Sequence, residues 1–101
     1  MNIIAVTACS TGIAETYMAA EVLERCARTR GHSIKVETQG ALGIMDKLSS
    51  QDIASADIAI LTNDIAINGD ERFEGLKTLH VSIGDILESP QDIMSEINSE
   101  S

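Results

Sequence analysis

The sequence predicts a single α/β domain in which a parallel sheet lies between two layers of helices. Short apolar segments, typical of buried strands, alternate along the chain with segments of helical periodicity, which is the pattern of repeated βα units. The chain has 101 residues, of which 44% are hydrophobic and only 2% aromatic, so aliphatic side chains must form the core. No linker or repeat interrupts the pattern, and we expect residues 1–101 to be one domain.

The first strand and the first helix have the clearest patterns. Asn2–Ala8 is apolar without alternation, which is typical of a strand buried on both faces. A helix is expected over about residues 12–30, because Met18, Val22 and Cys26 recur at helical spacing on one apolar face. Acidic residues come early in this segment and basic residues late, which suits the helix dipole.

The next part of the chain predicts a strand, a loop and a short helix. Ser33–Glu37 alternates apolar and polar residues, which favours a strand at the edge of the sheet. Thr38–Lys47 contains two glycines and is predicted to be a loop. Ser49, with Asp52 three residues later, resembles a capping box at the start of a short helix.

The second half of the chain predicts two further strands and a last helix. Asp57–Leu61 is apolar and is expected to be a second buried strand, whereas Asn68–Gly75 is predicted as a turn with one turn of helix. Thr78–Ile83 is expected to be the fourth strand. Ser89 followed by Pro90 indicates the start of a final helix. The apolar residues expected on its inner face are Ile93, Met94 and Ile97.

Strands that alternate with helices imply a parallel sheet with right-handed crossovers. Four strands with a switch point at the first one favour the order 2-1-3-4, as in flavodoxin-like and Rossmann-like sheets. The predicted fold is therefore a three-layer sandwich with a four-stranded parallel sheet. In such sheets the site lies beyond the carboxyl ends of the strands, beside the first strand, and Cys9 directly follows that strand.

The composition excludes several classes of partner. The formal net charge is -9 and the pI about 4.4, so the chain would be repelled by nucleic acid and by an anionic membrane surface. Two cysteines are too few for a disulfide framework, and we expect both to be thiols in a reducing compartment. The first apolar run lacks a basic segment and no run is long enough to span a bilayer, so neither a signal peptide nor a membrane helix is expected.

Cys9 stands at the turn between the first strand and the long helix, where a thiol can be activated. The start of a helix leaves about four backbone N–H groups without partners, which favours an anion and lowers the pKa of a thiol from about 8.5. Small and hydroxyl-bearing residues follow, and they leave room for a tetrahedral phosphoryl group. The expected phosphate-binding residues are Ser10, Thr11, Gly12, Ile13, Ala14, Glu15 and Thr16.

Three classes of enzyme place a cysteine on such a loop. A C-x5-R phosphatase needs an arginine where this chain has Glu15, and a C-x-x-C redox protein needs a second cysteine where it has Gly12. A protein that carries a phosphoryl group on cysteine needs neither, and the residues favour this third class. Cys26, in contrast, is expected in the core. The two histidines lack a second ligand at metal spacing, so no metal or other cofactor is expected.

Four motifs in order resemble one known family. ACSTGIAETYMAAEVL, from Ala8 to Leu23, is similar to the signature C-P-T-G-I-A-H-T-F-M-A-A-E-A-L of the fructose-type enzyme IIB of the bacterial phosphoenolpyruvate-dependent sugar phosphotransferase system. VETQGALG, from Val36 to Gly43, resembles its V-E-T-Q-G-x-x-G. DIASADIAIL resembles the helix that leads into its third strand, and DERFEG, from Asp70 to Gly75, resembles its E-R-F-x-G.

This resemblance implies a phosphotransferase subunit. Cys9 would accept a phosphoryl group from a phosphohistidine of enzyme IIA and donate it to a sugar, fructose or a similar one, bound by the membrane component, enzyme IIC. The Ser10–Thr16 loop would hold the phosphoryl group. Because neither IIA nor IIC is part of this chain, it would act as a cytoplasmic monomer that reaches the inner face of the membrane through IIC.

Two departures from the family signature leave a second interpretation open. Ser10 stands where the family has proline, and Glu15 stands where it has histidine. An ionised Glu15 would repel a phosphoryl dianion, and the chain would then be a degenerate regulatory or docking module without phosphotransfer. In the other interpretation Glu15 only favours the first helical turn, where acids interact well with the dipole. The sugar and the donor IIA stay open in both.

Five residues outside the loop are secondary candidates. Glu37 and Gln39 end the second strand and could border the Cys9 loop. Asp64 follows the third strand and is expected to be a solvated loop acid rather than a ligand. Arg72 is equally compatible with phosphate or IIA binding and with a surface ion pair. Phe73, the only phenylalanine, is expected in the core.

Overall fold

A five-stranded mixed sheet forms the middle of the molecule, with the order β3-β2-β1-β4-β5. The structure is a computed structural model that describes residues 1–9 and 13–100. β1 lies at the centre and pairs in parallel with β2 and β4, while β5 extends the parallel sheet beyond β4. β3 is antiparallel to β2 and forms the opposite edge. The strands are β1 (Asn2–Ala8), β2 (Ser33–Gly40), β3 (Gly43–Met45), β4 (Ile58–Thr62) and β5 (Thr78–Val81).

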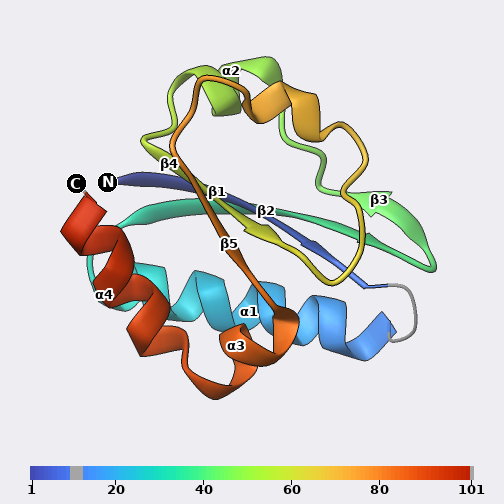
Figure 1. Ribbon diagram of the computed structural model, residues 1–101, viewed down its shortest axis with the longest axis horizontal. Helices are drawn as coiled ribbons and strands as arrows, with labels where there is room; N and C mark the ends of the chain where they lie inside the picture. The colour runs from blue at the N-terminus through green and yellow to red at the C-terminus, as the bar shows by residue number, and fades with distance from the viewer. Residues whose placement is uncertain (10–12, 101) are drawn as a thin grey trace.

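Helices cover both faces of the sheet, as Figure 1 shows. α1, α3 and α4 lie together on one face, and α2 and the 3-10 helix η1 lie on the other. The result is the predicted three-layer α/β sandwich, and the order β2-β1-β4-β5 reproduces the predicted order 2-1-3-4. The helices are α1 (Ile13–Thr29), α2 (Ser50–Ala54), η1 (Asp70–Phe73), α3 (Ile83–Glu88) and α4 (Pro90–Glu100).

The core is divided by the sheet into two apolar clusters. Successive side chains of a strand point to opposite faces, so Ile3 and Ala5 of β1 join the cluster under α1, α3 and α4. Ile4 and Val6 join the cluster on the other face, together with Phe73, which is buried as predicted. The inner residues of α4 are also buried as predicted: Ile93, Met94 and Ile97.

The segment predicted as a loop after the second strand is a β-hairpin. β2 continues to Gly40, and β3 pairs back on it in the register Gly40↔Gly43 and Thr38↔Met45. β2 is therefore an inner strand, and its prediction as an edge strand was wrong. The cause is that β3 has only 3 residues, all exposed, and begins at Gly43 with a φ of 94°, so it is too short to show the alternation of apolar and polar residues that marks a strand.

Two smaller predictions also need correction. The fourth strand ends at Val81, and Ile83 begins α3 instead of ending the strand. In α1, Met18 is 52% exposed, because the buried face is formed by its neighbours Ala19, Leu23 and Ala27. Within residues 1–9 and 13–100, no helix is long and apolar enough to cross a membrane.

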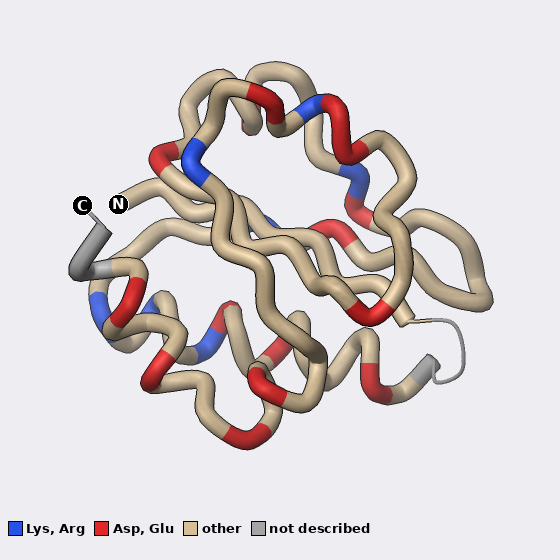
Figure 2. The backbone as a smooth tube through the Cα atoms, viewed as in Figure 1, with Lys and Arg blue, Asp and Glu red and all other residues tan. Residues whose placement is uncertain are grey.

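Charge is distributed unevenly over this framework. Acidic residues occur in both helical layers, whereas the tip of the β2–β3 hairpin carries no charged residue (Figure 2). Three exposed apolar side chains lie on this hairpin: Leu42, Ile44 and Met45 are 65%, 44% and 43% exposed. We call these three residues the apolar rim. Exposed apolar residues that gather at one end of an acidic molecule indicate a contact surface.

Candidate functional site

Cys9 lies directly beyond the carboxyl end of β1, the central strand. Its N–H donates a hydrogen bond to the carbonyl oxygen of Gln39 on β2, with an N···O distance of 3.3 Å. The side chain is partly buried, and it forms no disulfide with Cys26, which lies in the core as predicted. The sheet thus presents one partly accessible thiol at the edge where parallel α/β proteins bind ligands.

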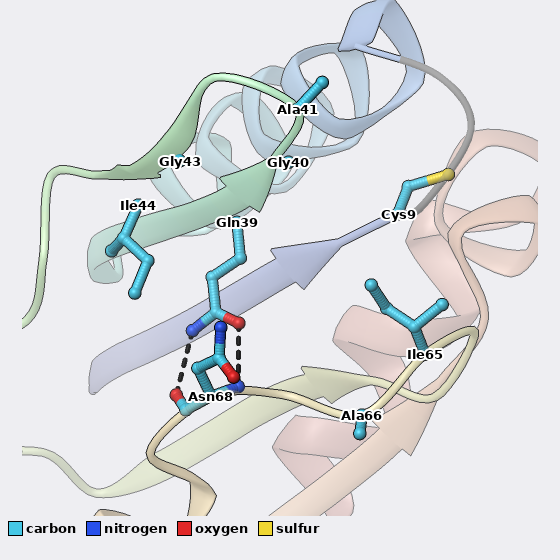
Figure 3. A pocket seen from close by; sticks show the side chains of 9 residues that line it. All are labelled: Cys9, Gln39, Gly40, Ala41, Gly43, Ile44, Ile65, Ala66 and Asn68. Carbon is cyan, nitrogen blue, oxygen red and sulfur yellow. Dashed lines mark hydrogen bonds between the residues drawn. The ribbon is translucent and has the colours of Figure 1, made fainter.

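The thiol borders a pocket of about 230 Å³ at this edge of the sheet. One wall comes from the end of β2 and the β2–β3 hairpin, and another from the loop that follows β4 (Figure 3). The volume suits a group of a few heavy atoms and is too small for a dinucleotide. The lining residues are Cys9, Gln39, Gly40, Ala41, Gly43, Ile44, Ile65, Ala66 and Asn68.

The side-chain amide of Gln39 connects two walls of this pocket. Its Nε2 donates to the carbonyl oxygen of Asn68 at 3.0 Å, and its Oε1 accepts from the N–H of Asn68 at 2.9 Å (Figure 3). The same Nε2 donates to Oε2 of Glu37 at 2.7 Å. Both residues had been expected as possible borders of the Cys9 loop. Gln39 lines the pocket with Cys9, whereas Glu37 is not a lining residue and contacts the pocket through Gln39.

Glu37 is a fully buried carboxylate, with a side chain 0% exposed. Its Oε1 accepts from the N–H of Leu48 at 2.9 Å and from Nη1 of Arg72 at 2.9 Å, and its Oε2 accepts from Nη2 of Arg72 at 3.0 Å. Burial raises the pKa of Glu37, but the hydrogen bonds from Arg72, Gln39 and Leu48 outweigh it, so the pKa lies below its ordinary value of 4.5. The carboxylate is therefore ionised at neutral pH.

Arg72 is held in place from several sides. Its Nε donates to the carbonyl oxygen of Gly69 at 2.7 Å, and its guanidinium carbon lies 4.9 Å from the centre of the Phe73 ring. Gly69 has a φ of 76°, and a Cβ there would lie 2.8 Å from Nε of Arg72, so both the turn and the guanidinium need glycine. Of the two roles left open for Arg72, the ion pair is present, and its partner is buried rather than on the surface.

The structure describes part of the predicted phosphate-binding loop. Ser10, Thr11 and Gly12 lie outside the described residues, and Ile13 begins α1. Ala14 and Glu15 are exposed in the first turn of the helix, and Thr16 is 1% exposed. α1 therefore begins four positions after Cys9, and the phosphate-binding role of the loop stays a prediction.

Two buried threonines anchor the end of β1 to its neighbouring elements. The hydroxyl of Thr7 donates to the carbonyl oxygen of Thr16 at 3.1 Å, which ties the strand to the first turn of α1. The N–H of Ala8 donates to the hydroxyl of Thr62 at 2.9 Å, which ties the strand to β4. These bonds fix the main chain immediately before Cys9.

Several pocket residues had not been predicted. The wall formed by Ile65, Ala66 and Asn68 follows β4 and carries no polar pattern that would indicate a site. Its position does follow from the topology, because β4 is the neighbour of β1 on the side opposite β2. Asp64 in the same segment is exposed, and its Oδ1 accepts from the N–H of Ile83 at 2.8 Å, so it helps to start α3.

The fold and the pocket together define a small α/β domain that presents a cysteine at the carboxyl edge of a parallel sheet. Residues 4–96 match the family described as "PTS system, Lactose/Cellobiose specific IIB subunit". A fructose-like EIIB component 2 of this system from Escherichia coli strain K12 is 50% identical over 98 residues, which cover 97% of this chain and 92% of the relative. A fructose-like EIIB component 3 from the same organism is 45% identical over 95 residues, covering 94% and 84%.

Solved structures agree with these sequences. The crystal structure of a predicted fructose-specific IIB from Escherichia coli superposes with a TM-score of 0.91 at 45% identity, covering 95% of this chain and 85% of that one. A solution structure of an enzyme IIB subunit from Escherichia coli K12 gives a TM-score of 0.91 at 38% identity, covering 98% and 92%. The chain belongs to the IIB family of the sugar phosphotransferase system, and its relatives are fructose-like members, as the sequence motifs had indicated.

Proposed function

We propose that this chain carries a phosphoryl group on Cys9, accepting it from a phosphohistidine of enzyme IIA and passing it to a sugar bound by the membrane component IIC. The observation that carries this proposal is the position of Cys9, beyond the central strand, before α1 and beside a pocket of about 230 Å³. Membership of the IIB family supports the proposal, since IIB components are parts of a sugar phosphotransfer system. The whole chain, residues 1–101, would act as one IIB domain.

The transfer would consist of two displacements at phosphorus. In the first, the Cys9 thiolate attacks the phosphohistidine, the S–P bond forms, and the P–N bond breaks so that the histidine nitrogen keeps the electron pair. In the second, a sugar hydroxyl attacks the phosphorus and releases its proton to the solvent, the O–P bond forms, and the S–P bond breaks so that Cys9 leaves as a thiolate. The start of α1 would favour the thiolate in the free protein and the phosphoryl charge in the loaded one. Ser10, Thr11, Gly12, Ile13, Ala14, Glu15 and Thr16 would surround that group.

The surface around Cys9 fits two protein partners better than a small free substrate. The uncharged hairpin forms one wall of the pocket and carries the apolar rim, and apolar residues of this kind become buried when proteins associate. One relative from Escherichia coli K12 is called a fructose-like EIIBC component; it is 46% identical over the whole of this chain, which spans 21% of it. That name joins a B with a C component in one protein. We propose that this chain acts as a monomer and meets IIC at the cytoplasmic face of the membrane.

The test is the intact mass of the protein after incubation with phosphoenolpyruvate, enzyme I, the phosphocarrier protein and a fructose-type IIA. Wild type should gain one phosphoryl group, and Cys9→Ser should gain none, because a serine hydroxyl is not ionised near neutral pH. Cys26→Ser is the matched control. It removes the other thiol, which lies on α1 in the hydrophobic core, and should be phosphorylated like wild type.

The same assay tests the role of Glu15, the residue that departs from the family signature. Glu15 is exposed in the first turn of α1, and we expect wild type to be phosphorylated despite its charge. Glu15→His should then change the rate of phosphorylation but gain the same single phosphoryl group. Phosphorylation of Glu15→His together with none of wild type would instead make the natural chain a degenerate docking module. Normal phosphorylation of Cys9→Ser would contradict the proposed role of Cys9.

A further inference from the structure

Gln39 makes contact with the nucleophile through its main chain and with the opposite wall of the pocket through its side chain. Its carbonyl oxygen accepts the N–H of Cys9 at 3.3 Å. Its side-chain amide forms two hydrogen bonds with the main chain of Asn68, at 3.0 and 2.9 Å. One residue therefore connects the end of β1 to the loop after β4, although Asn68 is 29 positions away in the sequence.

The orientation of this amide is imposed by the buried carboxylate next to it. Glu37 is ionised and can only accept hydrogen bonds, so the NH₂ end of Gln39 must face its Oε2 at 2.7 Å. The carbonyl end is then left to accept the N–H of Asn68. Arg72 and the N–H of Leu48 use the remaining positions of Glu37, which leaves the carboxylate no freedom to turn. A series of bonds runs from Arg72 through Glu37 and Gln39 to Asn68.

We propose that Gln39 is a positioning residue for phosphoryl transfer at Cys9, holding the wall formed by Ile65, Ala66 and Asn68 at a fixed distance from the thiol. The inference rests on the proposed function, because it assigns a role within that transfer. Transfer between two proteins requires the phosphorus and the sulfur to meet in line, and a displacement of about 1 Å costs about 100-fold in rate. A glutamine whose amide is fully bonded supplies such a constraint without entering the reaction itself.

Replacing the side-chain nitrogen of Gln39 by oxygen distinguishes a positioning role from a merely structural one. Gln39→Glu places a second carboxylate oxygen against Glu37, and two carboxylates at this distance share one proton readily but cannot both be ionised without strong repulsion. At acid pH the shared proton restores the bond between the two side chains, and the other oxygen of the new carboxyl accepts from the N–H of Asn68, so one of the two bonds to the wall returns while the bond to the Asn68 carbonyl stays lost. At neutral or alkaline pH the repulsion drives the new side chain away from Glu37 and Asn68.

The charged groups around Gln39 do not obscure this titration. Arg72 of η1 already forms two bonds with Glu37. Asp64 of the pocket loop bonds the N–H of Ile83, and four exposed charged residues lie on the flanking segments. These four are Asp46, Lys47, Asp70 and Glu71. The ratio of rates cancels their effect on the steps that variant and wild type share. They still influence the pH at which the new carboxyl titrates, above all Arg72, whose Nη2 also donates to the carbonyl oxygen of Asn68 at 3.1 Å, so the test uses the change of the ratio with pH and no fixed midpoint.

The experiment measures the rate of phosphorylation of Cys9 by phosphorylated IIA between pH 5.5 and 8.5, as the ratio of variant to wild type. We expect the ratio for Gln39→Glu to be about 0.01 at pH 8.5 and to rise at least tenfold by pH 5.5. Alkylation of Cys9 by iodoacetamide should follow wild type across the range, because the thiol itself is unchanged. Gln51→Glu, the same substitution on the exposed surface of α2, should give a ratio near 1 at every pH.

A second variant keeps the test decisive if Gln39→Glu is unstable. Gln39→Met has similar length and no charge, so it should lower the ratio at every pH without recovery in acid. A Gln39→Glu ratio that equals that of Gln51→Glu, or that is lowered equally at all pH values, would overturn the positioning role. Absence of phosphorylation in wild type itself would overturn the proposed function, and the role of Gln39 with it.

Discussion

At the scale of single residues, Glu37 and Arg72 form the most deeply buried ion pair among the residues that the structure describes. Glu37 is 0% exposed and Arg72 20% exposed, and two parallel hydrogen bonds join the side chains. An isolated buried charge costs far more than an exposed one, and a buried pair is tolerated only when every hydrogen-bonding position is used. In this pair the positions of the carboxylate are filled by Arg72, Gln39 and Leu48.

Removal of the arginine alone should therefore be strongly destabilising. Arg72→Leu leaves the Glu37 carboxylate buried without its cation, and we expect a loss of about 3–5 kcal/mol in the free energy of unfolding. Urea denaturation followed by circular dichroism measures this loss. The double variant Glu37→Leu, Arg72→Leu should recover a large part of it, because no charge remains in the core.

The control for this comparison is an ion pair on the surface. Arg25 and Glu21 are bonded at 2.9 Å on α1, with side chains 66% and 72% exposed. Arg25→Leu should change the free energy of unfolding by no more than about 0.5 kcal/mol, because solvent screens both charges. If Arg72→Leu and Arg25→Leu lose equal amounts of free energy of unfolding, the buried ion pair of Glu37 and Arg72 does not stabilise the fold more than an exposed pair does.

At the scale of elements, two short helices begin with the same device and differ in what they bury. Ser49 and Ser82 each accept a bond from the N–H three residues later, and Asp52 and Asp85 bond back to the N–H of the serine. α3 then buries Ile83 and Ile86, whereas α2 has no buried residue. The same type of cap therefore begins one helix that contributes buried side chains to the core and one that does not.

We expect the two caps to differ when the serine is replaced. Ser82→Ala should lower the free energy of unfolding by about 1 kcal/mol, since fraying of α3 exposes core residues. Ser49→Ala should lower it by clearly less, because α2 can fray without exposing any fully buried side chain. Urea denaturation measures both. Ser50→Ala, one residue beyond the cap of α2, controls for the change in helix propensity; a larger loss in Ser49→Ala than in Ser82→Ala would refute this account.

These elements also explain how far the sequence could be used to predict the structure. Continuous apolar runs located β1 and β4, helical spacing located α1, the Ser-Pro start located α4, and the S-x-x-D pattern located α2. The same pattern at Ser82 to Asp85 would have located α3, but the apolar residues on each side of it suggested a continuing strand. β3 could not be found in this way, because pairing with β2 is a tertiary effect that three exposed residues do not encode.

The site could be predicted only in part, for a related reason. Cys9 was found because a strand and a helix meet at it, and Gln39 because β2 was expected to lie beside β1. The buried pairing of Arg72 was not foreseen, because it depends on how η1 packs over the sheet and not on any local pattern. Asn68 contributes through main-chain atoms, so its residue type carries no signal.

At the scale of the whole molecule, the carboxylates determine how stability depends on pH. Burial raises and hydrogen bonding lowers the pKa of Glu37, which ends below its ordinary value of 4.5, and bonds to Lys35 and Ser49 lower the pKa of Asp52 from 3.8 to about 2. A carboxyl group with a lowered pKa contributes stability above its unfolded value and loses it as the pH falls through its folded value. The stability that these two carboxylates contribute is therefore lost between about pH 4.5 and about pH 2.

We expect the free energy of unfolding of wild type to fall steadily between pH 5 and pH 2. Glu37→Gln should be less stable at neutral pH, because it leaves Arg72 without its anion, but its stability should fall less steeply in acid. Urea denaturation at a series of pH values measures both slopes. Glu96→Gln, at an exposed carboxylate of α4, is the control and should keep the wild-type slope; an equally steep fall in Glu37→Gln would exclude Glu37 as a source of the acid sensitivity.

The central position of β1 has a consequence for how the pocket responds to a docking protein. A central strand opens only when the whole domain opens, whereas a short edge strand such as β3 can detach locally at little cost. Cys9 is attached to the former, and the apolar rim lies on and beside the latter. A docking partner can therefore displace β3 while β1 and β2 keep their register, so one side of the pocket can adjust while the main chain of Cys9 stays in place.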